Sequence, residues 1–402
     1  MNWLKLAKDT FVWLDSQSAL LFNPEAGKHL LFAIETPEVD HLLRSLADPY
    51  KLTCVNLHEE LAKNEKIRYI VDRITESGLG QTIQASDPPV SYPPQLNLQC
   101  DTFRALKDHG LQEEEFWNSY LKGITLYLTG DITENDIARQ ELYPLEGDSI
   151  LPISPVLDFV QDCLNIGLKT ISICAIPGRY PYESQLFDFI GKAPVRRRLF
   201  IRAKDFVLDD IKRYEIFDEI TLIYYKDFDS DAVVLQDTDT ELKARILVDN
   251  ENDCQEYLRI IEGKEKDGSI SLSPLFNGYN EKFFCDNVLL SHSEILEQQI
   301  EKRIIFARQR ANLNRFGLFS IFPNGNVYSN VFEEPTGTIN DSIQTLIARE
   351  MRSNKGWLEI RDNSPCSQCV GRWLCPSPTS QERLMNRLAC VEGKPLTARK
   401  NL

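Results

Sequence analysis

The stretch Thr170-Ile-Ser-Ile-Cys-Ala-Ile176 is an apolar segment enclosed by two helical patterns, and it decides the fold class of this chain. Before it, residues 155–165 carry apolar side chains at helical spacing, and Gly167 ends that pattern. After it, residues 182–190 repeat the helical spacing and lead into a second apolar segment, Leu199-Phe-Ile-Arg-Ala203. Buried strands that alternate with amphipathic helices predict a parallel sheet covered by helices, which is the α/β class.

The same alternation extends outward on both sides of this stretch. Further strands are expected at 95–99, 124–129, 219–225, 245–249 and 269–276. Further helices are expected at 103–109, 113–120, 205–214 and 253–262. Six or so strand–helix units predict a partial, open TIM-like barrel of βα units over residues 95–310. No phosphate-binding loop, nucleophile elbow or metal-ligand spacing is visible in this region.

Residues 1–80 form a separate module in which strands precede helices. Strands are expected at 10–14, 19–22 and 29–34, and helices begin after Thr36, Asn56 and Asn64. Three strands followed by three helices is a winged-helix-like order. Residues 81–94 contain paired prolines and are expected to link this module to the barrel.

Residues 311–402 are the third expected unit, with a hairpin at Asn324-Gly325, a helix over 338–352 and a cysteine segment. This segment reads Pro365-Cys-Ser-Gln-Cys-Val-Gly-Arg-Trp-Leu-Cys-Pro376. It places Cys366, Cys369 and Cys375 at Cys-x2-Cys-x5-Cys spacing, and Cys390 follows after fourteen intervening residues. Four thiolates can hold one tetrahedral metal ion or one cubane iron–sulfur cluster.

The spacing of these cysteines bears on which metal they would hold. Structural zinc sites usually combine two close cysteine pairs, whereas here only Cys366 and Cys369 form a close pair. The wider spread of Cys375 and Cys390 favours an iron–sulfur cluster, and we expect the [4Fe–4S] type. Zinc and unligated cysteines are the alternatives. A cluster with four cysteine ligands has no open iron, so its expected role is structural, with electron relay as the alternative.

The order of these units resembles a radical SAM protein with a C-terminal SPASM domain, because the Cys-x2-Cys-x5-Cys-Pro run recurs at SPASM auxiliary cluster sites. Radical SAM enzymes also carry Cys-x3-Cys-x2-Cys after the first barrel strand. This chain has Cys100 at the end of the expected first strand and then no cysteine before Cys163. Asn330 and Thr379 stand where two further SPASM cysteines would lie. The pattern is therefore similar to pseudo-radical SAM/SPASM proteins, which lack the SAM cluster.

This resemblance implies a non-catalytic companion of a true radical SAM/SPASM maturase that modifies a small ribosomally made peptide. It implies an iron–sulfur cluster at Cys366, Cys369, Cys375 and Cys390, and no bound S-adenosylmethionine. On this interpretation the chain is not itself the enzyme. The alternative is a redox accessory protein whose cluster relays electrons to the partner maturase.

The N-terminal module resembles the RiPP recognition element, a small domain that binds the leader of a precursor peptide. Such domains add the leader as a strand beside their third strand and against their third helix, which is β-augmentation. The resemblance places this groove at Leu30, Phe32, Ile70 and Arg73. A structural winged helix without a ligand is one alternative. A DNA-binding regulator is another, although the acidic helices of the module argue against it.

Charge and hydropathy exclude two classes of partner. The formal net charge of −15 opposes binding to nucleic acid, which is a polyanion. No apolar run is long enough to span a bilayer, and charges interrupt the N-terminus where a signal peptide would be apolar. We therefore expect a cytoplasmic protein that binds no membrane. In that compartment its ten cysteines would serve as metal ligands or buried thiols.

Overall fold

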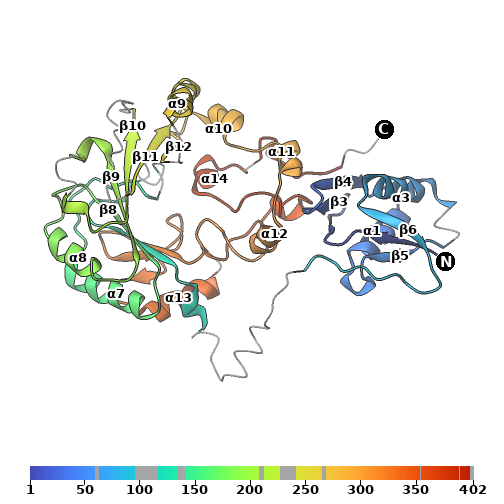
Figure 1. The fold of residues 1–402 in the computed structure, drawn as a ribbon, viewed down its shortest axis with the longest axis horizontal. Helices are drawn as coiled ribbons and strands as arrows, with labels where there is room; N and C mark the ends of the chain where they lie inside the picture. Colours follow the sequence, from blue (N-terminus) through green and yellow to red (C-terminus); the bar gives the residue numbers. More distant parts are fainter. Residues whose placement is uncertain are drawn as a thin grey trace.

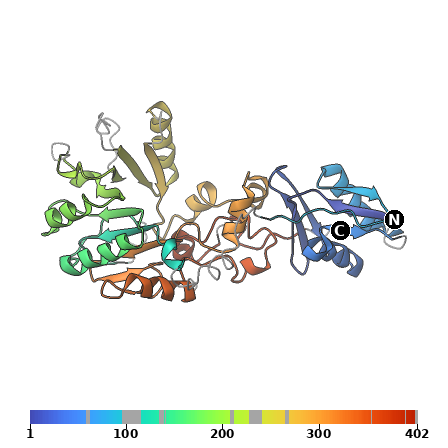
Figure 2. The same cartoon turned by 60° about the horizontal axis from the view of Figure 1, so that its bottom comes forward.

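The computed structural model describes residues 1–58, 63–95, 116–133, 139, 141–207, 212–226, 241–264, 269–353, 355–388 and 390–398. Figure 1 shows a larger lobe built on one sheet and a smaller lobe that contains the N-terminal module. Helices α11 (His292–Glu297) and α12 (Lys302–Arg308) lie between the two lobes in both views (Figures 1 and 2).

The larger lobe contains a nine-stranded, mostly parallel sheet with the order β12-β11-β10-β9-β8-β7-β13-β14-β15. These strands are β7 (Gly123–Tyr127), β8 (Thr170–Cys174), β9 (Arg196–Arg202), β10 (Glu219–Tyr225), β11 (Glu241–Val248), β12 (Ile270–Pro274), β13 (Leu318–Ile321), β14 (Asn326–Tyr328) and β15 (Gly337–Thr338). Strands β7 to β12 are parallel, and β13 joins parallel to β7 before β14 and β15 continue antiparallel. The α/β class is confirmed. The hairpin expected in the 311–402 unit extends the sheet of the 95–310 unit.

Helices cover one face of this sheet, because alternate strand residues and the apolar helix faces share one buried core. The helices on this face are α7 (Ile153–Asn165), α8 (Glu183–Ile190), α9 (Glu251–Lys264) and α13 (Ile343–Ser353). Phe159 of α7, for example, shares that core with Ile171 and Ile173 of β8. The expected helix at 155–165 and strand at 170–176 are thus confirmed to within two residues. The remaining short helices are α10 (Glu281–Asn287), α14 (Ser380–Met385) and the 3-10 turns η1 (Pro49–Lys51), η2 (Asn118–Tyr120), η3 (Ala203–Asp205) and η5 (Cys366–Gln368).

A second buried cluster fills the opposite face near the carboxyl ends of the strands. Its strand residues include Tyr127 of β7, Cys174 of β8 and Phe200 of β9. Tyr143 and Leu145, from the segment between β7 and α7, complete this cluster and are 6% and 4% exposed. This face of the sheet is therefore packed with side chains of the chain itself.

The N-terminal module has two small antiparallel sheets and two described helices, α1 (Pro37–Ala47) and α3 (Glu65–Ser77). One sheet has the order β2-β3-β4, from β2 (Phe11–Leu14), β3 (Ser18–Asn23) and β4 (Lys28–Ala33), as expected. The other has the order β5-β1-β6, from β5 (Cys54–Asn56), β1 (Asn2–Leu6) and β6 (Gly80–Gln84). Sequence reasoning missed this second sheet, although Leu4 and Leu6 alternate with Trp3 and Lys5 as a half-buried strand requires. The helix expected at 57–62 falls largely outside the described residues.

Strand β3 joins the two lobes because both of its faces are covered. Ala19 and Leu21 pack into the core of the module, against α1 and α3. Leu20 and Phe22 point the other way and share a core with Val370 of the cysteine segment. All six residues of β3 are buried as a result. The cysteine segment therefore packs directly against the sheet of the N-terminal module.

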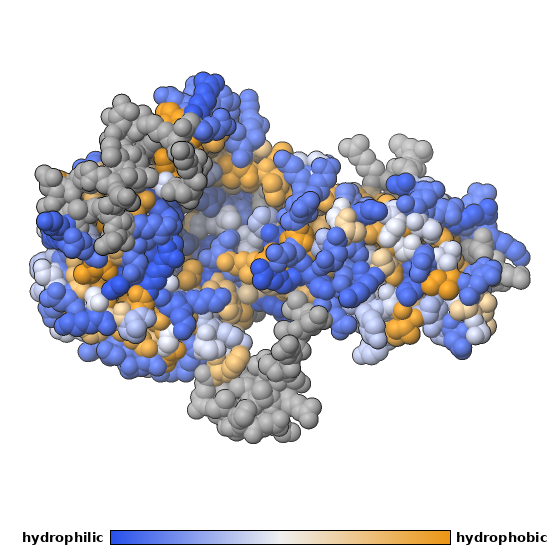
Figure 3. Space-filling model, in the orientation of Figure 1, coloured by the Kyte–Doolittle hydropathy of each residue, from blue (hydrophilic) through white to orange (hydrophobic). Residues whose placement is uncertain are grey.

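The surface and the helices of the chain agree with its charged composition. Hydrophilic residues predominate on the face shown in Figure 3, with smaller hydrophobic patches on both lobes. Within the described residues, every helix is too short or too polar to cross a bilayer.

Candidate metal centre

The four cysteines of the C-terminal segment come together around one cavity. Cys366 lies in η5, Cys369 follows it directly, and Cys375 lies farther along the same loop. Cys390 reaches the cavity from beyond α14. All four line this cavity, although fourteen residues separate the last of them from the other three.

The four sulfur atoms do not form a compact group of the kind that one metal ion holds. Sulfurs that share a zinc ion lie about 3.8 Å apart, because each Zn–S bond is about 2.3 Å long and the geometry is tetrahedral. Within the described residues, the one group of at least three ligand atoms that all lie within 4.8 Å of one another is His292, Cys390 and Glu392. No three of the cysteine sulfurs meet that limit. The sulfurs that hold a cubane cluster lie farther apart than those of a zinc site, because each sulfur then binds a different iron.

Burial makes the cysteine side chains poor free thiolates. It raises the pKa of the Cys375 thiol to about 12, against the opposing effect of the Arg361 guanidinium. Burial also raises the pKa of Cys369 and of Cys390. Thiols with raised pKa values stay protonated at neutral pH unless a metal replaces the proton. The cavity is therefore suited either to buried neutral thiols or to thiolates held by a metal.

Two arginines bring positive charge to this cavity. Arg361 is 6% exposed, and its guanidinium lies 4.0 Å from the Cys366 sulfur. Burial alone would lower the pKa of Arg361, but the Glu382 carboxylate bonded to it outweighs burial and raises that pKa. Burial lowers the pKa of Arg308, and the Cys375 sulfur acts in the opposite direction. A [4Fe–4S] core bound by four thiolates carries net negative charge in its common states, so buried guanidinium groups are suitable neighbours for it.

Hydrogen bonds to the backbone fix the shape of the cysteine loop. Arg361 donates from Nε to the Pro376 carbonyl at 2.6 Å, directly after Cys375. Gln298 and Arg308, from the region of α11 and α12, both donate to the Leu374 carbonyl. The position of Cys375 is therefore set from both sides by side chains that are distant in sequence. Sequence reasoning missed these groups, because nothing in their local pattern points to the loop.

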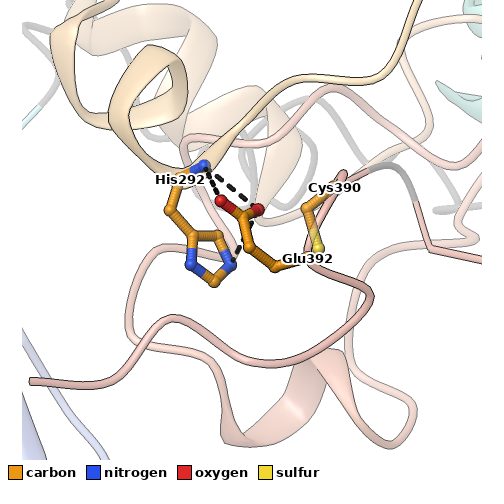
Figure 4. Close-up of side chains that lie close together, drawn as sticks. All are labelled: His292, Cys390 and Glu392. Carbon is orange, nitrogen blue, oxygen red and sulfur yellow. Dashed lines mark hydrogen bonds and ion pairs between the residues drawn. The ribbon is translucent and has the colours of Figure 1, made fainter. Parts of the chain in front are cut away.

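His292 lies beside Cys390, as Figure 4 shows. Its Nε2 is 3.6 Å from a Glu392 carboxylate oxygen and 3.0 Å from the Lys394 carbonyl oxygen. The Glu392 carboxylate also accepts from the His292 backbone N–H at 3.0 Å, so it ties the start of α11 to the loop after Cys390. The sequence offered no signal for this contact, since a hundred residues separate the two side chains. His292 also lines the cysteine cavity.

A second cavity lies between β4 and α3, where the leader-binding groove was expected. We call it the β4–α3 groove, and it is lined by Leu31, Phe32, Ala33, Glu35, Val39, Glu65, Lys66, Tyr69, Ile70 and Ala398. Of the four expected residues, Phe32 and Ile70 line it, whereas Leu30 and Arg73 do not. Leu30 is 8% exposed and packs in the module core. Arg73 lies farther along α3, on its exposed side near Glu76.

The segment that follows the first of the six parallel strands β7–β12 contains no cysteine. This segment covers residues 128–152, between β7 and α7. Sequence reasoning placed the corresponding loop after a strand at 95–99 that ends at Cys100, but residues 96–100 lie outside the described part of the chain. In both placements the sequence has no cysteine between Cys100 and Cys163.

Comparison with known proteins gives structural matches only. No family model matches the sequence, and no curated protein is significantly similar to it. Streptococcus suis SuiB bound to S-adenosylmethionine aligns with 97% of this chain and 98% of its own, at 12% identity and a TM-score of 0.44. SuiB bound to precursor peptide SuiA aligns with 94% and 96%, at 11% identity and a TM-score of 0.38. A heterocyclase in complex with substrate and cofactor aligns with 54% of this chain and 22% of its own, at 13% identity and a TM-score of 0.15. At these TM-scores the matches assign no family, and the function is inferred below from the chain itself.

Proposed function

We propose that this chain is a non-catalytic companion of a radical SAM peptide maturase, in the manner of pseudo-radical SAM/SPASM proteins. In this proposal it holds one [4Fe–4S] cluster at Cys366, Cys369, Cys375 and Cys390, and it binds a precursor-peptide leader in the β4–α3 groove. The observation that carries the proposal is the convergence of four widely spaced cysteines on one cavity, while the segment after β7 has none.

The cysteine cavity supports a cluster through three features. No three of its sulfurs lie within 4.8 Å of one another, and the guanidinium groups of Arg361 and Arg308 supply positive charge beside them. The Leu396 backbone N–H donates to the Cys369 sulfur at 3.2 Å, a bond of the kind that stabilises cluster thiolates. With all four ligands supplied by cysteine, the bound cluster would offer structural support or electron transfer and no open iron for a substrate.

The packed face of the sheet supports a non-catalytic role. In α/β barrels the substrate binds at the carboxyl ends of the strands. Here Tyr127 stacks on Phe322 at that end, with ring centroids 4.7 Å apart and an interplanar angle of 10°. Tyr143 and Leu145 cover the same region, and Gly130 faces Leu145 so closely that a Cβ would lie 2.5 Å from it. Self-packing of this kind leaves little room for S-adenosylmethionine beside these strands.

The β4–α3 groove supports peptide binding through its free strand edge. Within the described residues, β4 pairs only with β3, so its outer edge can accept a further strand. Phe32 and Ile70 supply an apolar floor, and Tyr69 is 55% exposed at the rim. The Glu35–Lys66 ion pair adds polar groups on the same wall. A leader with an extended segment and spaced apolar side chains matches this lining.

The cofactor part of the proposal is tested by anaerobic purification followed by iron, sulfide and zinc analysis. We expect a brown protein with about four irons per chain that loses iron in Cys366→Ser. The matched control is Cys254→Ser, on α9 and outside the cavity, which should keep its iron. Calorimetry with S-adenosylmethionine should give no binding heat. Tight S-adenosylmethionine binding, or stoichiometric zinc without iron, would overturn the assignment.

The peptide part is tested with synthetic leaders encoded by short reading frames beside the gene. We expect one of them to bind, and Tyr69→Ala to weaken it about tenfold, the usual effect of removing an aromatic anchor. Arg68→Ala is the matched control, because Arg68 is an exposed neighbour that does not line the groove. Equal loss in both variants would show that the groove is not the binding site.

A further inference from the structure

The segment Lys394–Ala398 contacts both proposed sites. Pro395 and Leu396 line the cysteine cavity, together with Lys394. Only two residues farther on, Ala398 lines the β4–α3 groove. We call this segment the strap.

The cysteine end of the strap is held by contacts with the ligand residues themselves. The Leu396 N–H donates to the Cys369 sulfur at 3.2 Å, and the Leu396 side chain is 5% exposed. It lies so close to Gly371 that a Cβ there would come within 2.9 Å of it. The Lys394 carbonyl accepts from the Cys390 thiol at 3.7 Å, a bond that exists only while this thiol is protonated, so the effect of the cofactor on the strap depends on the Leu396 bond to Cys369. A hydrogen bond to a metal-bound thiolate is stronger than one to a neutral thiol, so cofactor loading should tighten this end.

The groove end of the strap is held by β3. The Ala398 N–H donates to Ser18 Oγ at 2.8 Å. Ser18 is fully buried and pairs with Ala33, the last residue of β4. Ala33 itself lines the groove. The groove stays open with Ala398 in place, so the strap forms part of its wall.

We propose that the strap couples cofactor occupancy of the cysteine site to the formation of the β4–α3 groove. This inference rests on the proposed function and adds its regulation. With the cofactor bound, the strap is fixed at Cys369 and Ala398 completes the groove, so a leader meets a preorganised wall. Without it, the Leu396 hydrogen bond to Cys369 is weaker, so the strap opens more often and Ala398 leaves the groove wall more often. By thermodynamic linkage, the factor by which the bound cofactor raises the affinity for a leader is also the factor by which a bound leader raises the affinity for the cofactor.

The test is hydrogen–deuterium exchange of the full chain, compared before and after anaerobic chelation of the cofactor. We expect exchange to accelerate about fivefold both in the strap and at the Ala33 end of β4, the effect of losing one hydrogen bond of about 1 kcal/mol. Acceleration confined to residues 366–390 would overturn the inference. Iron and sulfide content, measured on the same samples, reports separately on whether the proposed cluster is present.

Two variants separate the strap from the cofactor itself. Ser18→Ala removes the acceptor of the Ala398 hydrogen bond, and the variant should keep its iron. Before any chelation, we expect β4 of this variant to exchange as fast as β4 of the chelated wild-type protein. Ser86→Ala is the matched control, because Ser86 is an exposed serine that follows β6 and its hydroxyl donates to Asp87. A variant that ends after Leu396 lacks Ala398 and should behave like Ser18→Ala. Because it leaves the buried Ser18 unchanged, it shows whether the effect of Ser18→Ala comes from the lost bond or from misfolding. If both variants still respond to chelation at β4 as the wild type does, the strap is not the coupling element.

Discussion

Arg361→Gln is expected to destabilise the cysteine loop more than any nearby surface change. The Arg361 guanidinium donates to both Glu382 oxygens, at 2.8 and 2.9 Å, and the two side chains are 5% and 10% exposed. Breaking a buried ion pair by removing one partner costs about 3–5 kcal/mol. Because Glu382 keeps the bonds that cap α14 from Thr379, we expect the low end, about 3 kcal/mol.

The assay is anaerobic urea titration, monitored by the visible absorbance of the bound cofactor. For a slope of about 2 kcal/mol per M, the midpoint for cofactor loss should fall by about 1–2 M. Arg383→Gln, on the helix α14 that also carries Glu382, is the matched control. Arg383 pairs with Glu333 and Glu359 but is 35% exposed, so its loss should cost about 1 kcal/mol or less. Equal midpoints for the two variants would refute the reasoning that the buried pair holds the loop.

Three further predictions concern the sheet and the contact between the lobes. Glu219→Gln should cost about 3 kcal/mol in thermal unfolding at neutral pH, because the buried carboxylate accepts from Arg198 and Lys243. Burial alone would raise the pKa of Glu219, but Lys243 and Arg198 outweigh burial and lower it. Its stabilisation is therefore complete above the ordinary glutamate range and is lost as the pH falls through the lowered pKa, so the two proteins should converge in acid. Phe322→Ala should cost about 3–4 kcal/mol by removing the ring stacked on Tyr127, and an unchanged midpoint would show that this face is not a packed core. Lys302→Met removes the 2.7 Å ion pair with Asp9 and should speed proteolysis at residues 81–94, whereas a wild-type cleavage rate would mean the pair does not hold the lobes together.

The order of strands and helices in the larger lobe followed from sequence because it depends on local periodicity. The strand at 170–176 and the helix at 155–165 show this, since their apolar spacing is set by the backbone geometry alone. Strand β1 was missed because the charges of the N-terminus were used only to argue against a signal peptide, although Leu4 and Leu6 are buried and alternate with the half-buried Trp3 and Lys5. The alternation of Leu4 and Leu6 with their neighbours over 2–6 was a signal for a strand that the sequence analysis did not use.

The lining of the β4–α3 groove was predicted only in part, because it depends on how β4 and α3 are oriented toward each other. Phe32 and Ile70 follow from placing a strand beside a helix, but which neighbours join them depends on how the two elements turn toward each other. Arg73 is one turn away from Ile70 on α3 and faces solvent instead. Ala398 could not have been found, because no local pattern reveals that a distant segment returns to the module.

The sequence by itself determined the α/β class through its periodicity, and the chemistry of its side chains named four cysteines as candidate ligands. Tertiary structure decided that four cysteines share one cavity, that Arg361 and Arg308 stand beside them, and that β3 is covered on both faces. It also decided the path of Lys394–Ala398 between two sites. The physical reason is that each of these contacts joins segments far apart in the chain, and such contacts depend on how packed elements meet, which spacing along one segment does not encode.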